Sequence, residues 1–213
     1  MPTTKEQPLP AAAGQERPDE RPVPSERRDE LVRLAGELFA ERGFAGTTIR
    51  HIADRAGILP GSLYHHFESK EAILDELLTG FWEKLMDRFE RATQDAPSGS
   101  DALRGLLQAA VLIVRQYPIE LAIVHKDADA LQQLPSFAYL AGARSAAERP
   151  WIETLRRGVA DGTFRADLDV ELTHRVIWGG ITGLIRWLSD GDDRDDRDVV
   201  AAVTDLVMPG LLP

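Results

Sequence analysis

The most constraining feature of the sequence is the stretch of residues 47–70, TTIRHIADRAGILPGSLYHHFESK, which has the pattern of two short helices around a glycine. Thr47 can cap the first helix, and Gly57 stands where that helix must end, because glycine adopts a left-handed conformation without steric cost. Pro60 suits the first turn of a second helix, which we expect to run to about His66. The apolar positions recur at helical spacing: Ile49, Ile52, Ala53, Ala56, Leu63 and Phe67. The stretch therefore predicts a helix-turn-helix, whose second helix fits the major groove of DNA.

The same stretch resembles the TetR family of bacterial transcriptional regulators. The pattern Thr-(x)4-Ile-Ala-x-x-Ala-Gly-(x)3-Gly-x-Leu-Tyr-x-x-Phe-x-x-Lys runs from Thr47 to Lys70. One position departs from it, since the family usually has Ser or Thr where this chain has Leu59. Leucine cannot cap the recognition helix, so either Pro60 and the packing of Leu59 compensate or the start of the helix frays.

The resemblance extends more loosely from about Ser25 to the C-terminus, and the run 58–67 is similar to actinobacterial members that control lipid and sterol catabolism. It implies a homodimeric repressor that binds a pseudo-palindromic operator in double-stranded DNA and is released by a small ligand. It implies neither an enzyme nor a cofactor. An interaction protein that has lost DNA binding is the alternative, and the intact helix-turn-helix argues against it.

Nine residues of this region are candidates for DNA contact. The resemblance places Tyr64 and Lys70 at phosphates, while a core tyrosine and a solvated lysine are the alternatives. Arg50 can read guanine, and small residues after Pro60 allow close approach to base edges. The full set is Thr47, Thr48, Arg50, Pro60, Gly61, Ser62, Tyr64, His65 and Lys70.

The net charge of −10 is unusual for a protein that binds DNA, but it is unevenly distributed. Residues 25–70 carry seven Lys/Arg and seven Asp/Glu, whereas residues 71–213 carry a net charge of −9. The acidity therefore lies away from the helix-turn-helix, where it discourages non-specific binding to DNA.

The spacing of apolar residues predicts an all-α protein, since no strand-like alternation of useful length occurs. We expect a disordered tail over 1–24, a DNA-binding domain over 25–70 and a ligand-binding and dimerisation domain over 71–213. Ser25 and Ser69 are expected to cap the first and fourth helices. Further helices are expected over 102–116, 119–133, 137–161, 170–188 and 199–208, and Pro150 should kink or split the third of these.

Large apolar and aromatic side chains of the expected body suit a cavity for an amphipathic ligand. The candidates are Leu106, Ile113, Ile123, His125, Phe137, Tyr139, Trp151 and Trp178. Ordinary core and dimer packing is the alternative for each of them. The resemblance to regulators of lipid catabolism implies a fatty or sterol-derived acyl-CoA as effector, with neutral amphipathic compounds as the alternative. Cations for its phosphates are available, unless carboxylates pair with them, at Arg104, Arg115, Lys126, Arg144, Arg149, Arg156 and Arg157.

The last two expected helices carry more apolar surface than one subunit can readily bury. We expect two copies to pack as a four-helix dimer interface, in which glycines allow close approach. The residues are Val176, Ile177, Gly180, Ile181, Leu184, Leu188, Val199, Val203 and Leu206. Packing of these faces wholly within one subunit is the alternative.

Other functional classes find little support. The chain has no cysteine, and it lacks the Gly-x-Ser-x-Gly, Gly-rich phosphate-loop and His-Glu-x-x-His motifs. A triad of Ser136, His125 and Asp127 has no spacing that requires it, and Glu171 with His174 lacks a third metal ligand, so no metal site is expected. Without cysteine, a secretory signal or a run of about 18 apolar residues, we expect a cytoplasmic protein that does not span a membrane.

Overall fold

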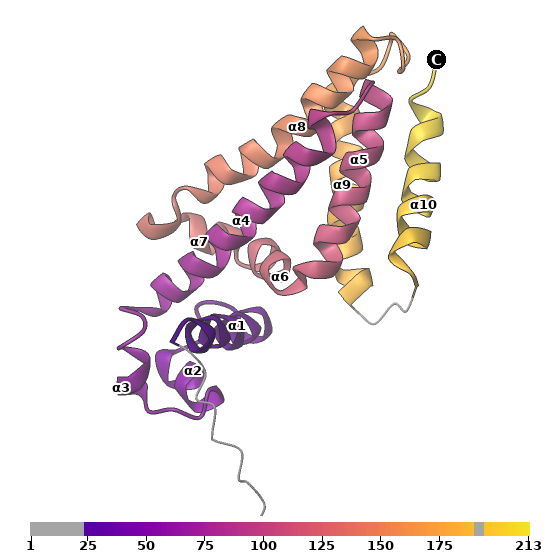
Figure 1. The fold of residues 1–213 in the computed structure, drawn as a ribbon. Helices are drawn as coiled ribbons and strands as arrows, with labels where there is room; N and C mark the ends of the chain where they lie inside the picture. Colours follow the sequence, from indigo (N-terminus) through magenta and orange to yellow (C-terminus); the bar gives the residue numbers. More distant parts are fainter. Residues whose placement is uncertain (1–23, 190–193) are drawn as a thin grey trace, which may run out of the picture.

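The computed structural model describes residues 24–189 and 194–213, and within these ranges all regular secondary structure is helical, which confirms the all-α prediction (Figure 1). The predicted tail falls almost wholly outside the described residues. A small head is followed by a long connecting helix and a helical body. The elements are α1 (Pro24–Arg42), α2 (Ile49–Arg55), α3 (Pro60–Leu63), α4 (Lys70–Gln94), α5 (Gly99–Gln116), α6 (Pro118–Lys126), α7 (Ala128–Gln132), η1 (Pro135–Phe137), α8 (Leu140–Ala160), α9 (Val170–Ser189), α10 (Asp196–Val207) and η2 (Met208–Gly210).

Several predicted helix ends are shifted. Helix α1 begins at Pro24, so Ser25 lies inside it, whereas Ser69 caps α4 as predicted by accepting the Ala72 N–H (3.1 Å). The helix predicted over 119–133 is divided at Asp127 into α6 and α7. Pro150 does not split its helix, because α8 runs continuously through it; the alternative expectation, a kink at Pro150, stays a prediction. Burial of the adjacent Trp151 offsets the backbone hydrogen bond that proline removes.

Two hydrophobic cores hold the chain. The head core combines apolar side chains of α1, α2 and α3 with Ile73, Leu74 and Leu78 of α4, and it also contains residues from far along the chain: Ile123, Leu131, Phe137 and Leu140. The body core gathers α5 with the second half of α4, α8, α9 and α10. The head therefore does not fold around its own residues alone, and the boundary at residue 70 stays a prediction.

Helix α5 is the centre of the body and packs against α4, α8, α9 and α10. Its start lies so close to α8 that a Cβ on Gly99 would stand 2.3 Å from the backbone of Gly158, so only glycine fits there. No single helix among the described residues is long and apolar enough to span a membrane. Only α5 and α6 taken together pass that test, and they are bent by 92° relative to each other.

Candidate functional site

The helix-turn-helix has the predicted order, with corrections at two of its helix ends. The cap of α2 is Thr48 rather than Thr47: its hydroxyl accepts the His51 N–H (3.2 Å), and His51 Nδ1 accepts the Thr48 N–H (3.3 Å). Gly57 follows with φ 66°, as the turn requires. Helix α3 ends at Leu63 instead of His66 and continues only as turns.

Leu59 starts α3 without a side-chain hydrogen bond, so Pro60 supplies the only local preference for a helix start at this point. The leucine side chain does not pack, because it is 76% exposed. The sequence-based expectation that packing of Leu59 compensates for the missing cap is therefore wrong.

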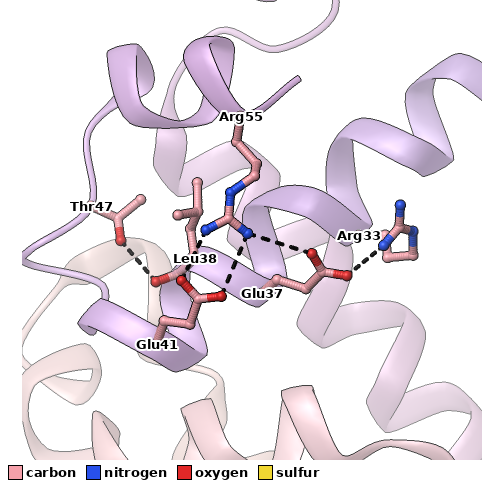
Figure 2. A network of polar contacts seen from close by, with 6 residues as sticks. All are labelled: Arg33, Glu37, Leu38, Glu41, Thr47 and Arg55. Atoms are coloured by element: carbon pink, nitrogen blue, oxygen red, sulfur yellow. Dashed lines mark hydrogen bonds and ion pairs between the residues drawn. The ribbon is translucent and has the colours of Figure 1, made fainter. Parts of the chain in front are cut away.

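Thr47 is fully buried, and its hydroxyl lies 2.9 Å from the Gly43 carbonyl and 3.2 Å from the Leu38 carbonyl, the contact drawn in Figure 2. It fixes the turn between α1 and α2 and presents no hydroxyl to a nucleic acid, so we remove it from the candidates for DNA contact. In the same network, Arg55 of α2 binds Glu41 (3.0 Å) and lies 3.8 Å from Glu37 of α1. The hydrogen bond from Arg55 lowers the pKa of Glu41.

The remaining head candidates lie in and beside α2 and α3, and most of them are exposed. Tyr64 is 57% exposed, while its neighbours Leu63 and Phe67 are buried, as predicted. Arg50 lies outside the core on α2, with only a long ion pair to Asp54 (3.9 Å). The others are exposed, apart from the partly exposed Pro60: Thr48, Gly61, Ser62 and His65. The placement is compatible with contact to DNA, and these contacts stay predictions.

Lys70 has a structural role that the sequence did not indicate. Its ammonium donates to the Phe44 carbonyl (2.9 Å) and the Thr47 carbonyl (3.1 Å), and it lies 4.2 Å from the centre of the Phe44 ring. Two of its three N–H donors therefore hold the loop that precedes α2. Only the third is left for a phosphate.

Arg28 of α1 is a further positioning residue that sequence reasoning missed. Its guanidinium donates twice to Glu76 of α4 (Nε–Oε1 3.0 Å, Nη2–Oε2 2.6 Å) and once to the His66 carbonyl, which lies just after α3. It also lies 4.1 Å from the centre of the Phe67 ring. This one side chain connects α1, the end of the recognition segment and α4. Its position on the polar side of α1 carries no sequence signal that separates it from ordinary surface arginines.

A cavity of about 350 Å³ lies where the two cores meet. Phe81, Phe89 and Ile185 of the body core line it, and so do Leu131 and Leu140 of the head core. The other lining residues come from α4 to α9: Trp82, Leu85, Ala110, Ile113, Val114, Leu121, Val124, His125, Ala128, Gln132, Arg144, Trp178, Ile181 and Thr182. The wall is mostly apolar, and its polar residues His125, Gln132 and Arg144 are exposed, which marks the open end.

Three of the eight predicted ligand contacts line this cavity: Ile113, His125 and Trp178. The others do not, because helix rotation directs them elsewhere. Leu106 and Trp151 are buried in the body core, and Ile123 and Phe137 in the head core. Tyr139 lies beside Asp75 and Thr79 of α4, where partial burial raises the pKa of Tyr139 to about 12.

A second hollow of about 610 Å³ lies between α9 and α10. It is lined by seven of the nine predicted interface residues: Val176, Ile177, Gly180, Ile181, Leu184, Val203 and Leu206. Val176 and Leu206 are 66% and 83% exposed, which is unusual for apolar side chains on packed helices. Val199 is instead buried in the body core, and the side chain of Leu188 falls outside the described residues.

Residues 31–77 match the family "Bacterial regulatory proteins, tetR family", and residues 96–211 match "Tetracyclin repressor-like, C-terminal domain". The chain is 38% identical over 194 residues to the HTH-type transcriptional repressor KstR2 of Mycolicibacterium smegmatis, which covers 91% of this chain and 95% of that protein.

Solved structures give the same result. The ketosteroid transcriptional regulator KstR2 of Mycobacterium tuberculosis has a TM-score of 0.83 at 36% identity, covering 88% of this chain and 95% of that one. AibR, solved with isovaleryl coenzyme A and operator DNA, has a TM-score of 0.75 at 18% identity, over 86% and 98% of the two chains. The latter likeness shows a shared fold.

The positioning role of Arg28 can be tested by Arg28→Gln. We expect the variant to lose about 1–3 kcal/mol of unfolding free energy in urea, because hydrogen bonds to the Glu76 carboxylate and the His66 carbonyl are lost. The affinity of Arg28→Gln for operator DNA should also be lower than that of the parent protein. Arg33→Gln is the matched control on α1, since it breaks only an exposed pair with Glu37 and should cost less than about 0.5 kcal/mol. Equal stability and DNA affinity of the two variants would contradict the assignment.

Proposed function

This chain belongs to the TetR family of bacterial regulatory proteins and is a ligand-responsive DNA-binding repressor, and we propose that its effector is an acyl-CoA thioester bound in the cavity between the two cores. The position of that cavity carries the proposal. Leu131 and Leu140 belong to the head core and line the cavity, so a ligand there touches the packing that orients the head. The hydrolase alternative is set aside.

Helix α6 offers a direct route from the cavity to the head. Leu121, Val124 and His125 line the cavity on one side of the helix. At its end, the Asp127 carboxylate accepts the Phe44 N–H (2.9 Å), and the Lys126 ammonium lies 3.3 Å from two carbonyls at the end of α1. A shift of α6 on ligand binding would therefore move the turn that precedes α2.

Helix α4 supplies a second route. Helix α4 begins just after the recognition segment and runs from the head into the body (Figure 1). Farther along it, Phe81, Trp82, Leu85 and Phe89 line the cavity. Ligand binding releases DNA only if the ligand favours the conformation that cannot bind DNA, because equal affinity for both conformations shifts nothing. Through α6 and α4, a ligand that fits the cavity better in one orientation of the head would favour that orientation.

The chemistry of the cavity supports an amphipathic effector. Its apolar interior suits an acyl or polycyclic group, and Arg144 with His125 and Gln132 at the open end suits a polar one. A relative at 36% identity is named as a ketosteroid regulator, and a relative in fold was solved with a CoA thioester. Of the cations considered from the sequence, Arg144 alone lines the cavity, and its guanidinium forms an ion pair with Glu148 (3.2 Å). Arg115, Arg149 and Arg156 pair with Asp196, Glu153 and Glu171.

The effector class can be tested by releasing the protein from an operator selected out of random double-stranded DNA. Titrations would compare a steroid-acid CoA thioester and a long-chain acyl-CoA with their free acids and with CoA alone. We expect a thioester to act at least tenfold more potently than its acid, and CoA alone to be inactive. Equal potency of acid and thioester would exclude recognition of the CoA part, and no response to any compound would contradict the proposal.

Two matched variants test whether the effector releases DNA by binding in this cavity. Ala128→Trp narrows the cavity at α7, whereas Ala130→Trp adds the same ring to an exposed position of that helix that does not line the cavity. We expect the first variant to bind operator but to lose release, and the second to respond like the parent. Loss of release in both would point to damage of α7 instead of the cavity.

We also propose that a second copy of this chain covers the hollow between α9 and α10. Family members act as dimers, and a pseudo-palindromic operator needs two recognition helices related by a two-fold axis. The exposed Val176 and Leu206, together with Leu172, form an apolar surface that spans both helices. Leu172 was missed by sequence reasoning because it lies a full turn before the predicted residues.

Leu206→Glu tests this interface. We expect sedimentation at micromolar concentration to report a dimer for the parent and a monomer for the variant, because a buried unpaired carboxylate is strongly unfavourable. The monomer should bind operator at least a hundredfold more weakly. Ala202→Glu adds the same charge to an exposed position of α10 that does not line the hollow, and it should remain dimeric. A parent protein that sediments as a monomer would contradict the proposal.

A further inference from the structure

Leu59 stands immediately before the recognition helix α3, at a position where the fold gains little from a leucine. Its side chain makes no capping hydrogen bond and is 76% exposed, so it stabilises neither the helix start nor the core. The helices on either side are capped differently, since Thr48 before α2 and Ser69 before α4 each accept a backbone N–H. A hydroxyl side chain would do the same for α3. The stability of the head therefore does not explain Leu59.

A single exposed leucine is common on protein surfaces, so its location decides what it can contact. Other exposed apolar side chains, Leu172, Val176 and Leu206, lie on the surface of α9 and α10 that we propose a second copy covers. Leu59 lies in the head, at the opposite end of the molecule from α10 (Figure 1). A second copy on α9 and α10 therefore leaves Leu59 exposed, and the partner that the head meets is operator DNA.

The residues that follow Leu59 suit a close approach to base pairs. Gly61 and Ser62 are exposed, and a Cβ on Gly61 would find no atom within 4 Å. In a helix-turn-helix, the first residues of the recognition helix contact base edges in the major groove. Small residues after Leu59 allow this end of α3 to come close to the bases, where a leucine side chain is long enough to touch a base edge.

The chemistry of leucine selects among the base edges. Its side chain has no hydrogen-bond donor or acceptor, and thymine is the only one of the four bases whose major-groove edge carries a methyl group. Contact between leucine and that methyl group removes apolar surface from water on both sides. Contact with the nitrogen and oxygen atoms of the other bases would instead remove water from polar groups without replacing their hydrogen bonds. A leucine at this place therefore favours thymine.

We propose that the Leu59 side chain contacts the C5 methyl group of one thymine in each half of the operator and thereby fixes that base in the recognised sequence. The contact does not require the effector cavity, but its occurrence in both halves rests on the proposed dimer. Burial of one methyl group contributes about fourfold in affinity. The contact therefore selects a base pair without dominating the affinity for DNA.

Replacement of thymine by deoxyuridine tests the contact, because deoxyuridine pairs with adenine in the same way but lacks the methyl group. Each thymine of an operator selected by the parent protein would be replaced in turn, and the affinity measured by fluorescence anisotropy without effector. We expect the parent to lose about fourfold in affinity at one thymine of each half-site, and about fifteenfold when both are replaced. Leu59→Ala should bind the unmodified operator more weakly and show no measurable loss at these two positions.

Leu59→Ser separates recognition from folding. Its hydroxyl can cap α3 as Ser69 caps α4, so we expect this variant to unfold at a higher urea concentration than the parent. It should nevertheless be as insensitive to the two methyl groups as Leu59→Ala. Replacement of thymines elsewhere in the operator should change the affinity of all three proteins equally.

The possible failures can be told apart. If the parent responds to the loss of no methyl group, or if both variants respond as the parent does at the same thymines, the proposed contact is overturned. A single responsive thymine in the whole operator, lost in both variants, would support the contact and contradict the two-fold arrangement instead. None of these results depends on the effector cavity, because no effector is present.

Discussion

The packing of body side chains into the head core is the constraint on which the rest of the structure depends. Ile123 of α6 and Phe137 of η1 are fully buried among residues of α1, α2 and α4, and the Phe137 ring meets the Phe44 ring edge-on at 5.8 Å. The orientation of the head is thus set by apolar burial against the body as well as by α4. Because cores are close-packed, small displacements of these side chains cannot be absorbed locally. A cavity bounded by the same core is well placed to bias the orientation.

Polar contacts at one turn complement that packing. The backbone of Phe44 is held from two sides. Its N–H donates to Asp127 of the body, and its carbonyl accepts from Lys70 at the start of α4. The loop that leads into α2 is therefore held from the cavity side and from the recognition side. Arg28 provides an equivalent link between the end of the recognition segment and α4. The contacts of Phe44 and of Arg28 are thus two places at which a displacement of a body helix would alter the position of the helix-turn-helix.

The sequence predicted best the features that local chemistry determines. The glycine turn, the helix start at Pro60 and the alternation of exposed Tyr64 with buried Leu63 follow from conformational preference and helical spacing. Long-range placement could not be predicted in the same way. Phe137 and Trp151 are aromatic residues of the kind that line cavities, yet the rotation of their segments buries them in two different cores. Lys70 matched a phosphate-binding position, but its hydrogen bonds to the Phe44 and Thr47 carbonyls depend on a turn that lies 26 and 23 residues earlier in the chain.

The central claim is that a ligand between the cores changes the orientation of the heads. The chain contains no cysteine, so Glu68→Cys, at an exposed position after α3, allows one spin label in each subunit. Pulsed electron paramagnetic resonance would then measure the distance between the two heads of the dimer with and without effector. A spin label at position 202, introduced by Ala202→Cys, would report on the dimer interface. We expect saturating effector to shift the head-to-head distance by several ångströms while the Ala202 distance stays constant. An unchanged head-to-head distance at an effector concentration that releases DNA would contradict the claim.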